Sequence, residues 1–595
     1  MEAASGRDMK KRNLRSRSLL ELGLALALMV VFNYLSSRVF HRFDFTEEKR
    51  YTLSEASINL AKSLDDVFYV KIYLDGDDLP PAYKNLRNAS KEMFDEFRYA
   101  SGGKIEYEIY NPLDGLEGDE LRNVLVELRE SGIQATDLYE KTNDGSRQKL
   151  IVPGAHVFYK GAQYPLFLID PSLTVNNPGT LNKAVEGLEF AIANAIRRCV
   201  QTEMKAIAFM DGHGELPDFE LLDAKRLLDE YYRVERMNLN FDDSAFYGQI
   251  LDKLRTVAED SLGFAVDRFV KEKLNGYDAI IFAKPRIAFA EREKYWIDQY
   301  IMQGGKVMWM IDPLLIETDS LARYGKVFTA DYDLNLTDLL FKYGVRVNFD
   351  LVQDYNSLIV PFGREGGGVE PKPWFYFPVL PSMNNHAINR NLDLVWLQYP
   401  ATLDTVGSTS LKKTVLLQTT GLARVSNHPA EVDMQIVRKP PAEDYFPNRD
   451  KIMAVLVEGR FESNYTLANR KELDPQKTFI DHVDKGKMVV VSDGDLMFNL
   501  VRPDGQYYPA GYDRLSKKTF GNRQFFMNCI DYLVDDFGLI EVRNKDIQLR
   551  ILDQEKINLP KEQNKWKSLN MALPVAVILL FGVVNGVIRK RKYER

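Results

Sequence analysis

The stretch AIAFMDGHGELPD, residues 206–218, is the part of the sequence that says most about the fold. An apolar run of small and β-forming residues ends at Asp211, and two glycines, a histidine and a glutamate follow before a Pro-Asp pair. This order is typical of a strand, a tight loop and the start of a helix. Open parallel sheets bind ligands at the carboxyl ends of their strands, so this loop is a candidate site.

The alternation of strand and helix patterns continues along the chain. Further strand patterns lie at 232–239, 278–285, 306–313 and 487–499, and helix patterns lie at 250–261, 290–305 and 522–536. Such alternation predicts a mostly parallel sheet with helices on both faces. Residues from about 350 to 450 are rich in Gly, Pro and aromatic residues, and we expect an insertion of extended segments there.

The residues before this region predict a smaller α/β domain. Its expected elements are strands at 67–76 and 104–112, an amphipathic helix at 81–101 between them, a hairpin at 156–169 and a long helix at 180–200. The hairpin should turn at Lys160-Gly161, because glycine tolerates the backbone angles of a tight turn. We expect the boundary between the two domains directly after residue 200.

Two apolar segments, residues 19–35 and 569–588, are each long enough to cross a bilayer as a helix, which takes about 17–25 residues. The alternatives are a cleaved signal peptide for the first and a buried core helix for the second. Lys and Arg cluster before the first segment and after the second, and such residues stay on the cytoplasmic side. We therefore predict that residues 1–18 and 589–595 are cytoplasmic and that the body between the two spans lies across the membrane.

The formal net charge of −7 is unevenly distributed. Residues 1–18 and residues 589–595 each carry +4, which leaves −15 for residues 19–588. An acidic body is a poor binder of nucleic acid, so we expect no nucleic-acid partner. The basic ends suit the anionic headgroups of membrane lipid.

Small residues recur at the spacing that lets two membrane helices pack closely. Gly582 and Gly586 form a GxxxG pattern in the second apolar segment, and Gly23 and Ala27 form a related pattern in the first. These four residues are candidate helix-packing positions, against each other or against another membrane subunit. Chance occurrence of glycine in a membrane helix is the alternative.

Acidic side chains and one imidazole follow the predicted strands. The residues concerned are Asp211, His213, Glu215, Asp312 and Asp493. Together they could ligate a divalent cation or act as acid and base. The alternative is a structural turn, in which Gly212 and Gly214 supply the backbone freedom of a tight loop and Asp211 caps the next helix.

The motifs of common enzyme classes are missing from the sequence. There is no GxSxG nucleophile turn, no GxxxxGK[ST] phosphate loop and no CxxC pair, and the two cysteines are Cys199 and Cys529. We therefore expect no catalytic residue, no metal and no cofactor. The residues expected to contact a ligand are Asp211, Gly212, His213, Gly214, Glu215 and Asp312.

Seven stretches, taken in order, resemble a known family. They are RFDFTEEKRYTLSEAS, VFYVKIYLDG, EFAIANAIRR, AFMDGHGE, YIMQGGKVMWMIDP, VVSDGDLMFN and FFMNCIDYL. This order, together with the two apolar termini, resembles the GldG family of gliding-motility proteins. More broadly, it resembles the auxiliary proteins of an ABC-type transport system. The resemblance covers nearly the whole chain.

The resemblance implies a bacterial inner-membrane protein with a periplasmic body. It implies a thioredoxin-like α/β domain at 36–200 and an amidotransferase-like, or flavodoxin-like, α/β domain at 201–550, joined by a linker at 551–568 to the second span. It also implies a GldF-like permease and a GldA-like ATP-binding subunit as partners, contacts with periplasmic or envelope proteins, and a link to gliding motility and type IX secretion. Because the chain lacks the cysteines of either enzyme fold, we expect both domains to bind rather than to react.

Two other functions remain open from the sequence. One is a solute-binding module that holds a sugar or a peptide on the Gly212–Glu215 loop, with the aromatic run Trp374–Phe377 lining the cleft. The other is a metal-dependent hydrolase built on the acidic strand ends.

Overall fold

The computed structural model describes most of the chain. The described residues are 23–24, 26–31, 52–76, 79–133, 135–142, 145–169, 178–200, 204–240, 243, 248, 250, 252, 262–363, 368–382, 384–390, 392–407, 410–438, 441–447, 450–466, 473, 478–535, 538–542 and 560–593. Two compact units are distinguished. One is Leu53–Lys545, and the other combines Met1–Thr52 with Asp546–Arg595.

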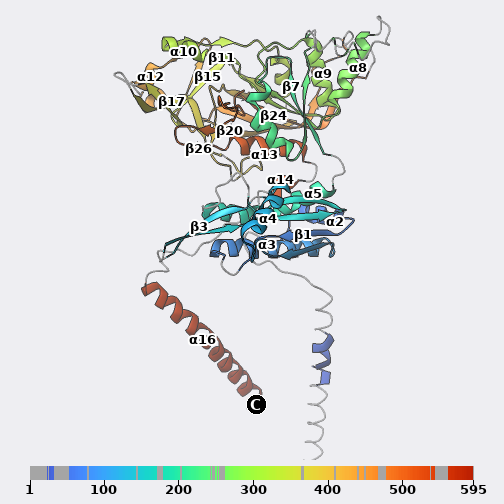
Figure 1. The fold of residues 1–595 in the computed structure, drawn as a ribbon, viewed down its shortest axis with the longest axis vertical. Coiled ribbons are helices and arrows are strands. Elements are labelled where there is room, and N and C mark those ends of the chain that lie inside the picture. The colour runs from blue at the N-terminus through green and yellow to red at the C-terminus, as the bar shows by residue number, and fades with distance from the viewer. Residues whose placement is uncertain are drawn as a thin grey trace, which may run out of the picture. The chain divides into compact units, whose positions relative to one another are not determined.

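A small sheet forms the first part of the unit Leu53–Lys545 (Figure 1). Its strands are β1 (Phe68–Ile72), β2 (Ile105–Ile109), β5 (Gly154–Tyr159) and β6 (Ala162–Phe167), in the order β2-β1-β5-β6. Strands β1 and β2 are parallel, and β5 is antiparallel to both β1 and β6. The predicted hairpin is confirmed, and Lys160 and Gly161 both have positive φ at its turn.

Four helices and a separate hairpin complete this part. The helices are α2 (Glu55–Ser63), α3 (Pro81–Ala100), α4 (Gly118–Glu130) and α5 (Pro178–Val200). The hairpin consists of β3 (Thr136–Thr142) and β4 (Gly145–Ile151). Helix α3 begins at a proline, whose missing N–H costs nothing at a helix start. It buries Leu86, Phe94 and Phe97 on one face, as its periodicity predicts. Late in the chain, α14 (Leu539–Val542) adds Leu539 and Val542 to the same core.

A larger mixed sheet carries the AIAFMD strand. Its strands are β7 (Ala206–Asp211), β8 (Arg233–Asn238), β9 (Ala279–Ala283), β10 (Lys306–Met310), β14 (Val345–Val347), β19 (Leu403–Thr405), β20 (Leu411–Gln418), β23 (Ile452–Glu462) and β24 (His482–Val491). The order is β14-β19-β23-β24-β10-β9-β7-β8, with β20 also paired to β23. The five strands from β24 to β8 are parallel, as predicted. The rest are antiparallel, so the expectation of a mostly parallel sheet holds for only part of it.

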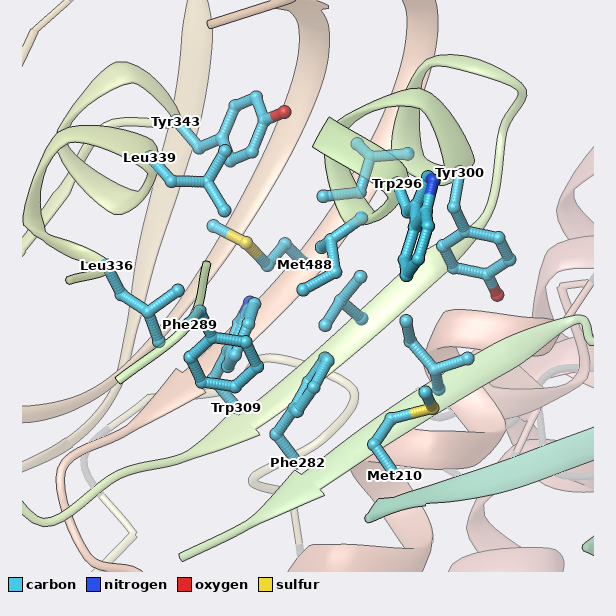
Figure 2. Close-up of a cluster of buried hydrophobic side chains, with 14 of the residues drawn as sticks. Met210, Phe282, Phe289, Trp296, Tyr300, Trp309, Leu336, Leu339, Tyr343 and Met488 are labelled. Atoms are coloured by element: carbon cyan, nitrogen blue, oxygen red, sulfur yellow. The ribbon is translucent and has the colours of Figure 1, made fainter. Parts of the chain in front are cut away.

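Both faces of this sheet are covered. Successive residues of β7 enter different cores, with Ala208 on one face and Phe209 on the other. Helices α8 (Leu262–Leu274) and α9 (Glu291–Met302) contribute to the first core, and α6 (Leu222–Asp229) and α13 (Asn522–Val534) contribute to the second. Phe282 of β9 stacks on Trp309 of β10, with ring centroids 4.1 Å apart (Figure 2). The predicted helix at 250–261 lies largely outside the described residues.

The region from about 350 to 450 consists mainly of extended segments, as expected. It holds β15 (Asp350–Asp354), β16 (Ser357–Gly363), β17 (Val369–Leu380), β18 (Val395–Trp396), β21 (Ala423–Asn427), β22 (Glu431–Asp433), α12 (Gln435–Arg438) and η3 (Glu443–Tyr445), besides β19 and β20. The remaining short elements of the chain outside this region are η1 (Asp218–Glu220), β11 (Leu314–Leu315), α10 (Thr318–Tyr324), β12 (Lys326–Phe328), β13 (Ala330–Asp331), α11 (Thr337–Lys342), β25 (Tyr512–Asp513) and β26 (Lys518–Thr519). Two strands of the large sheet, β19 and β20, thus come from inside the predicted insertion.

The second unit contains the long helix α16 (Pro560–Tyr593). Within its segment Asn564–Ile588, an 18-residue window has a mean hydropathy of 2.4 and none of it is buried. Among the described residues, this is the one helix that is long and apolar enough to cross a membrane. Of the first predicted span, residues 23–24 and 26–31 are helical and the rest lies outside the described residues. A Cβ added to Gly23, Gly582 or Gly586 would meet no described atom within 4 Å.

Candidate ligand site at the carboxyl edge of the parallel strands

Four loops follow neighbouring parallel strands at one edge of the large sheet. They are the Asp211–Glu215 loop after β7, Lys284–Arg286 after β9, Asp312 after β10 and Asp493–Asp495 after β24. The strand register places their first residues close together, because Met310 of β10 pairs with both Ala283 and Val491. The prediction that these residues follow strands at one edge of the sheet is confirmed, and a ligand site there stays a prediction.

A buried ion cluster joins three of these loops. The Nζ of Lys284 lies 3.0 Å from Oδ2 of Asp312, and it also donates to the carboxylate of Asp495. The second oxygen of Asp312 accepts the backbone N–H of Gly494 at 2.6 Å. The carboxyl of Asp493 accepts two backbone N–H groups, from Gln398 at 2.8 Å and from Asp495 at 2.7 Å. One ammonium therefore pairs with two carboxylates, and the carboxyl group of Asp493 interacts electrostatically with both of them.

Burial shifts the protonation of this cluster. Burial raises the pKa of the Asp312 carboxyl above its ordinary value, against the effect of the nearby Lys284 ammonium. Burial also raises the pKa of Asp493 well above its usual range, and the carboxylates of Asp312 and Asp495 raise it further. Burial alone would lower the pKa of Lys284, but the two carboxylates outweigh it and raise that pKa. Lys284 thus stays charged, while burial shifts the carboxyl groups of Asp312 and Asp493 toward their protonated forms.

Close backbone contact shapes the cluster. Lys284 has a φ of +60°, which is unusual for a residue with a side chain. A Cβ at Gly494 would lie 2.6 Å from Cγ of Lys284 and 3.1 Å from its Cα. Only glycine at position 494 lets the loop after β24 approach Lys284 this closely.

A second buried group surrounds His213. The ring of His213 stacks on Phe289, with centroids 3.8 Å apart, and its Nε2 lies 3.0 Å from Oε2 of Glu293 on α9. Its backbone N–H donates to Oε2 of Glu215 at 2.6 Å, and its carbonyl accepts N–H groups from Arg286 and Ile287. His213 is 1% exposed, so its imidazole is part of the core rather than a group that faces solvent.

One pair of polar atoms in this group lacks a hydrogen bond. Nδ1 of His213 and Oε1 of Glu215 are 3.8 Å apart, and neither forms a hydrogen bond with any described residue. Burial raises the pKa of the Glu215 carboxyl, against the effect of His213. The loop therefore holds a buried carboxyl group that favours its protonated form.

The remaining residues of the loop are structural. Asp211 accepts the N–H of Gly212 at 2.9 Å and the Nε of Arg236 at 3.0 Å. Gly212 has a φ of +104°, and a Cβ there would lie 2.4 Å from Oδ1 of Asn238. Gly214 also has a positive φ, of +73°. The two glycines thus supply the backbone freedom of a tight loop, as the structural alternative predicted. The predicted helix cap at Asp211 is wrong, because its carboxylate binds Gly212 and Arg236, and the N-cap position of η1 is Pro217, without a side-chain hydrogen bond.

The five acidic and imidazole residues do not form one constellation. His213 and Glu215 lie with Glu293, Asp312 pairs with Lys284, and Asp211 pairs with Arg236. Asp493 accepts the backbone N–H groups of Gln398 and Asp495. Among the described residues, no group of three or more His, Cys, Asp and Glu side chains is arranged to hold a metal ion. Glu293 was not among the predicted site residues, although a glutamate in the first turn of the helix pattern at 290–305 is a recognisable signal.

A cavity of about 510 Å³ lies beside this edge. Its walls come from β16, from the residues around Trp396 and from the chain between Phe498 and Asn522, and Asp495 of the ion cluster also lines it. Of the aromatic run predicted to line a cleft, Phe377 does so, whereas Trp374, Phe375 and Tyr376 are 2–4% exposed and belong to the interior. The sequence did not single out the segment Tyr508–Leu515, which supplies much of the wall.

Comparison with known proteins identifies the family. The model of a family described as "ABC-type uncharacterized transport system" matches residues 204–529, and a model described as a domain of unknown function matches residues 47–158. An uncharacterized protein of Borreliella burgdorferi is 19% identical over 588 residues, which cover 97% of this chain and 99% of that protein. The chain belongs to the ABC-type uncharacterized transport system family.

Solved structures are less similar. The mmIFT52 N-terminal domain is 15% identical, with a TM-score of 0.30 over 56% of this chain and 98% of that chain. The exo-β-1,4-mannosidase Op5Man5 from Opitutaceae bacterium strain TAV5 is 9% identical, with a TM-score of 0.18 over 78% of this chain and 51% of that chain. Likeness at this level carries no conclusion about this chain. The broad resemblance to auxiliary transport proteins is thus confirmed by the family, and the GldG resemblance stays a prediction.

Proposed function

We propose that the chain is a non-enzymatic, membrane-anchored accessory subunit of an ABC transporter, with its α/β body outside the cytoplasm as the interaction module. The family match over residues 204–529 carries this proposal, since it indicates an accessory role beside transporter components. The exposed apolar helix Asn564–Ile588 supports the anchor. The internally paired Asp211–Glu215 loop supports a body that binds rather than reacts.

The narrower form of the proposal has two spans, with both termini in the cytoplasm of the inner membrane. The basic residues at both chain ends support this orientation. We include in it a thioredoxin-like first domain, which the strand order β2-β1-β5-β6 with a parallel β1–β2 pair supports. An amidotransferase-like second domain is supported by its parallel strands with helices on both faces.

The expected partners are a GldF-like permease and a GldA-like ATP-binding subunit, with roles in gliding motility and type IX secretion. This part rests on the sequence resemblance. Deletion of the gene in a gliding host should abolish colony spreading and secretion if the narrow proposal holds. Spreading that is unchanged, while the transporter complex is lost, would leave only the broader accessory role.

Purification from membranes tests the proposal itself. The tagged full-length chain, extracted in mild detergent, should copurify with a polytopic permease and an ATP-binding subunit in fixed ratio. A matched variant that lacks residues 560–593 should lose the permease if α16 contacts it. Recovery of the full-length chain alone, under conditions that keep other ABC complexes intact, would contradict the proposal.

Protease protection tests the orientation. Protease added outside spheroplasts should digest the body and leave short terminal fragments protected by the membrane. A body that stays intact until the membrane is disrupted would place it in the cytoplasm.

Binding of a solute, such as a sugar or a peptide, is a second candidate function. The 510 Å³ cavity beside Asp495 favours it, whereas the tightly packed Gly212–Glu215 loop does not.

A further inference from the structure

The cavity beside Asp495 has the size and the walls of a ligand site. Its volume of about 510 Å³ lies within the range of small-molecule sites, which is roughly 300–1,000 Å³. Its lining includes five aromatic side chains: Phe377, Trp396, Phe498, Tyr508 and Tyr512. The rings of Tyr508 and Tyr512 stack with their centroids 5.3 Å apart and their planes at 3°, and together they form one flat part of the wall. Such walls suit the apolar side chains of a ligand.

The polar side chains of the lining differ in whether they already form hydrogen bonds within the protein. Asp513 accepts the backbone N–H groups of Leu515 and Ser516, and the amide of Asn522 bonds to the backbone of Trp396 and Leu496. These two side chains hold the wall together. They have little capacity left for a ligand.

Two other side chains retain that capacity. Asp495 gives one carboxylate oxygen to Lys284, and its other oxygen accepts no hydrogen bond from a described residue. Gln398 bonds through its backbone N–H to Asp493, while its side-chain amide bonds to no described residue. A carboxylate oxygen and a free amide together suit the N–H groups of a ligand.

Arg514 adds an exposed positive charge to the lining. Its guanidinium lies over the ring of Tyr508, 5.6 Å from the centroid, and pairs with no carboxylate among the described residues. Arg502 lies over the same ring at 5.7 Å but pairs with Asp504 at 2.9 Å, and it does not line the cavity. Arg514 is therefore the guanidinium available for an anionic group, which it can bind through two parallel N–H donors.

The ligand that fits must offer apolar side chains, N–H donors and an anion together. A fatty acid lacks the N–H donors, and a neutral sugar lacks the anion. We propose that the cavity binds the carboxyl terminus of a peptide that ends in apolar or aromatic residues, with its α-carboxylate on Arg514 and its backbone N–H groups facing Asp495 and Gln398. Capture of a terminal carboxylate is a known mode of peptide recognition.

The neighbouring strand argues against binding by strand addition. Strand β16 contributes Leu358, Val360 and Pro361 to the lining and is an edge strand of its three-stranded sheet. Pro361 has no N–H to donate to an added strand. Recognition therefore comes from side-chain pockets and the terminal carboxylate rather than from a continuous backbone ladder.

Calorimetric titration of the detergent-solubilised full chain tests the proposal. The probes are acetyl-Ala-Ala-Leu-Phe with a free carboxylate and the same peptide as its C-terminal amide. The free acid should bind, and the amide should bind at least about tenfold more weakly, because it cannot form a charge-assisted pair with Arg514. Equal affinity for the two peptides would overturn the proposal.

Matched variants locate the site. Arg514→Gln should lower the affinity for the free acid to that for the amide, and Arg502→Gln, which changes an already paired arginine over the same ring, should change neither. Phe498→Leu should weaken both peptides alike, since it removes apolar wall and leaves the ring beneath Arg514 in place. An Arg514→Gln variant that binds the free acid as wild type does would place the carboxylate elsewhere. Thermal unfolding of each variant checks that it is folded.

Competing ligands and the partner assay separate the remaining outcomes. Binding of maltotriose or laurate without binding of the peptide would assign the cavity to another ligand class and overturn the inference. The inference rests on the proposed accessory function only for its biological setting. If the permease copurifies but the peptide does not bind, the inference of a peptide site is contradicted and the accessory function is not. If the peptide binds but no permease copurifies, the accessory function is contradicted and the peptide site is not.

Discussion

The ammonium of Lys284 and the carboxylate of Asp312 meet 3.0 Å apart, although Lys284 follows β9 and Asp312 follows β10. Their side chains are 16% and 8% exposed, so solvent screens the pair only weakly. Asp495, from the loop after β24, also pairs with Lys284, so the ion cluster connects the loops that follow three strands. The edge of the sheet is thus held by charge as well as by backbone hydrogen bonds.

Removal of Lys284 should strongly destabilise the body. Lys284→Met leaves the carboxyl groups of Asp312 and Asp495 buried without their cation, and breaking a buried pair costs about 3–5 kcal/mol. Urea unfolding of the unit Leu53–Lys545 measures the loss. The control Lys326→Met breaks an exposed pair with Glu431, whose side chains are 62% and 41% exposed, and should cost less than about 1 kcal/mol. Similar losses for both variants would show that the cluster is not coupled.

Glu215→Gln should alter the pH dependence of stability. Burial raises the pKa of Glu215 above its ordinary value of 4.5, so as the pH rises from there the unfolded chain releases this proton before the folded chain does. The stability that Glu215 contributes to the wild type therefore decreases as the pH rises. The glutamine variant has no carboxyl group at this position, so its stability does not decrease for this reason. The difference in unfolding free energy between the glutamine variant and the wild type should therefore increase in favour of the variant as the pH rises above about 4.5.

Urea titrations at several pH values measure this difference. The control Glu106→Gln changes an exposed glutamate of β2 and should follow the wild type at every pH. A Glu215→Gln variant whose stability stays parallel to that of the wild type would mean that folding does not raise the pKa of Glu215.

Gly212→Ala should destabilise the protein much more than an alanine substitution at another glycine with positive φ. Its Cβ would meet Oδ1 of Asn238 at 2.4 Å and Cβ of Asn240 at 2.6 Å, in addition to the strain of a φ of +104°. The control Gly161→Ala has a φ of +82° with open space, and should cost about 1–2 kcal/mol from backbone strain alone. Thermal unfolding of both variants tests the difference, and equal shifts in Tm would rule out the steric contribution.

Deletions should reveal how many anchors the chain has. Removal of residues 560–593 alone should leave the protein in the membrane fraction if residues 19–35 form a second span. Removal of both terminal regions, which leaves Leu53–Lys545, should release a soluble and folded body. Extraction with carbonate followed by ultracentrifugation distinguishes the outcomes, and release by the single deletion would show that α16 is the only anchor.

Much of the fold could be predicted because its signals are local. The alternating pattern at 156–169 and the glycine after Lys160 specify a hairpin, and the structure has β5 and β6 with a turn at that pair. Apolar runs buried on both faces, as in β9 from Ala279 to Ala283, are typical of inner parallel strands. Strands β19 and β20 were not assigned to the large sheet, because their partner β23 lies later in the chain and strand pairing leaves no local signal.

The candidate site was predicted less well than the edge that carries it. His213 and Asp312 were both placed correctly at strand ends, but they belong to different groups, because Glu293 from α9 takes one and Lys284 takes the other. The cavity was missed since its lining comes from residues as far apart as Leu358 and Asn522. Spacing along the chain does not show which side chains a fold brings together.

By itself, the sequence determined the apolar helix near the carboxyl terminus, the strand–loop–helix character of residues 206–218 and the set of polar groups at the strand ends. These features depend on hydrophobic periodicity and on the conformational freedom of glycine, which act over a few residues. Tertiary structure alone decided that Lys284 neutralises Asp312 and Asp495, that His213 is buried against Phe289, and that a cavity opens beside Asp495. Those outcomes depend on strand order and register, which are set by packing between distant segments.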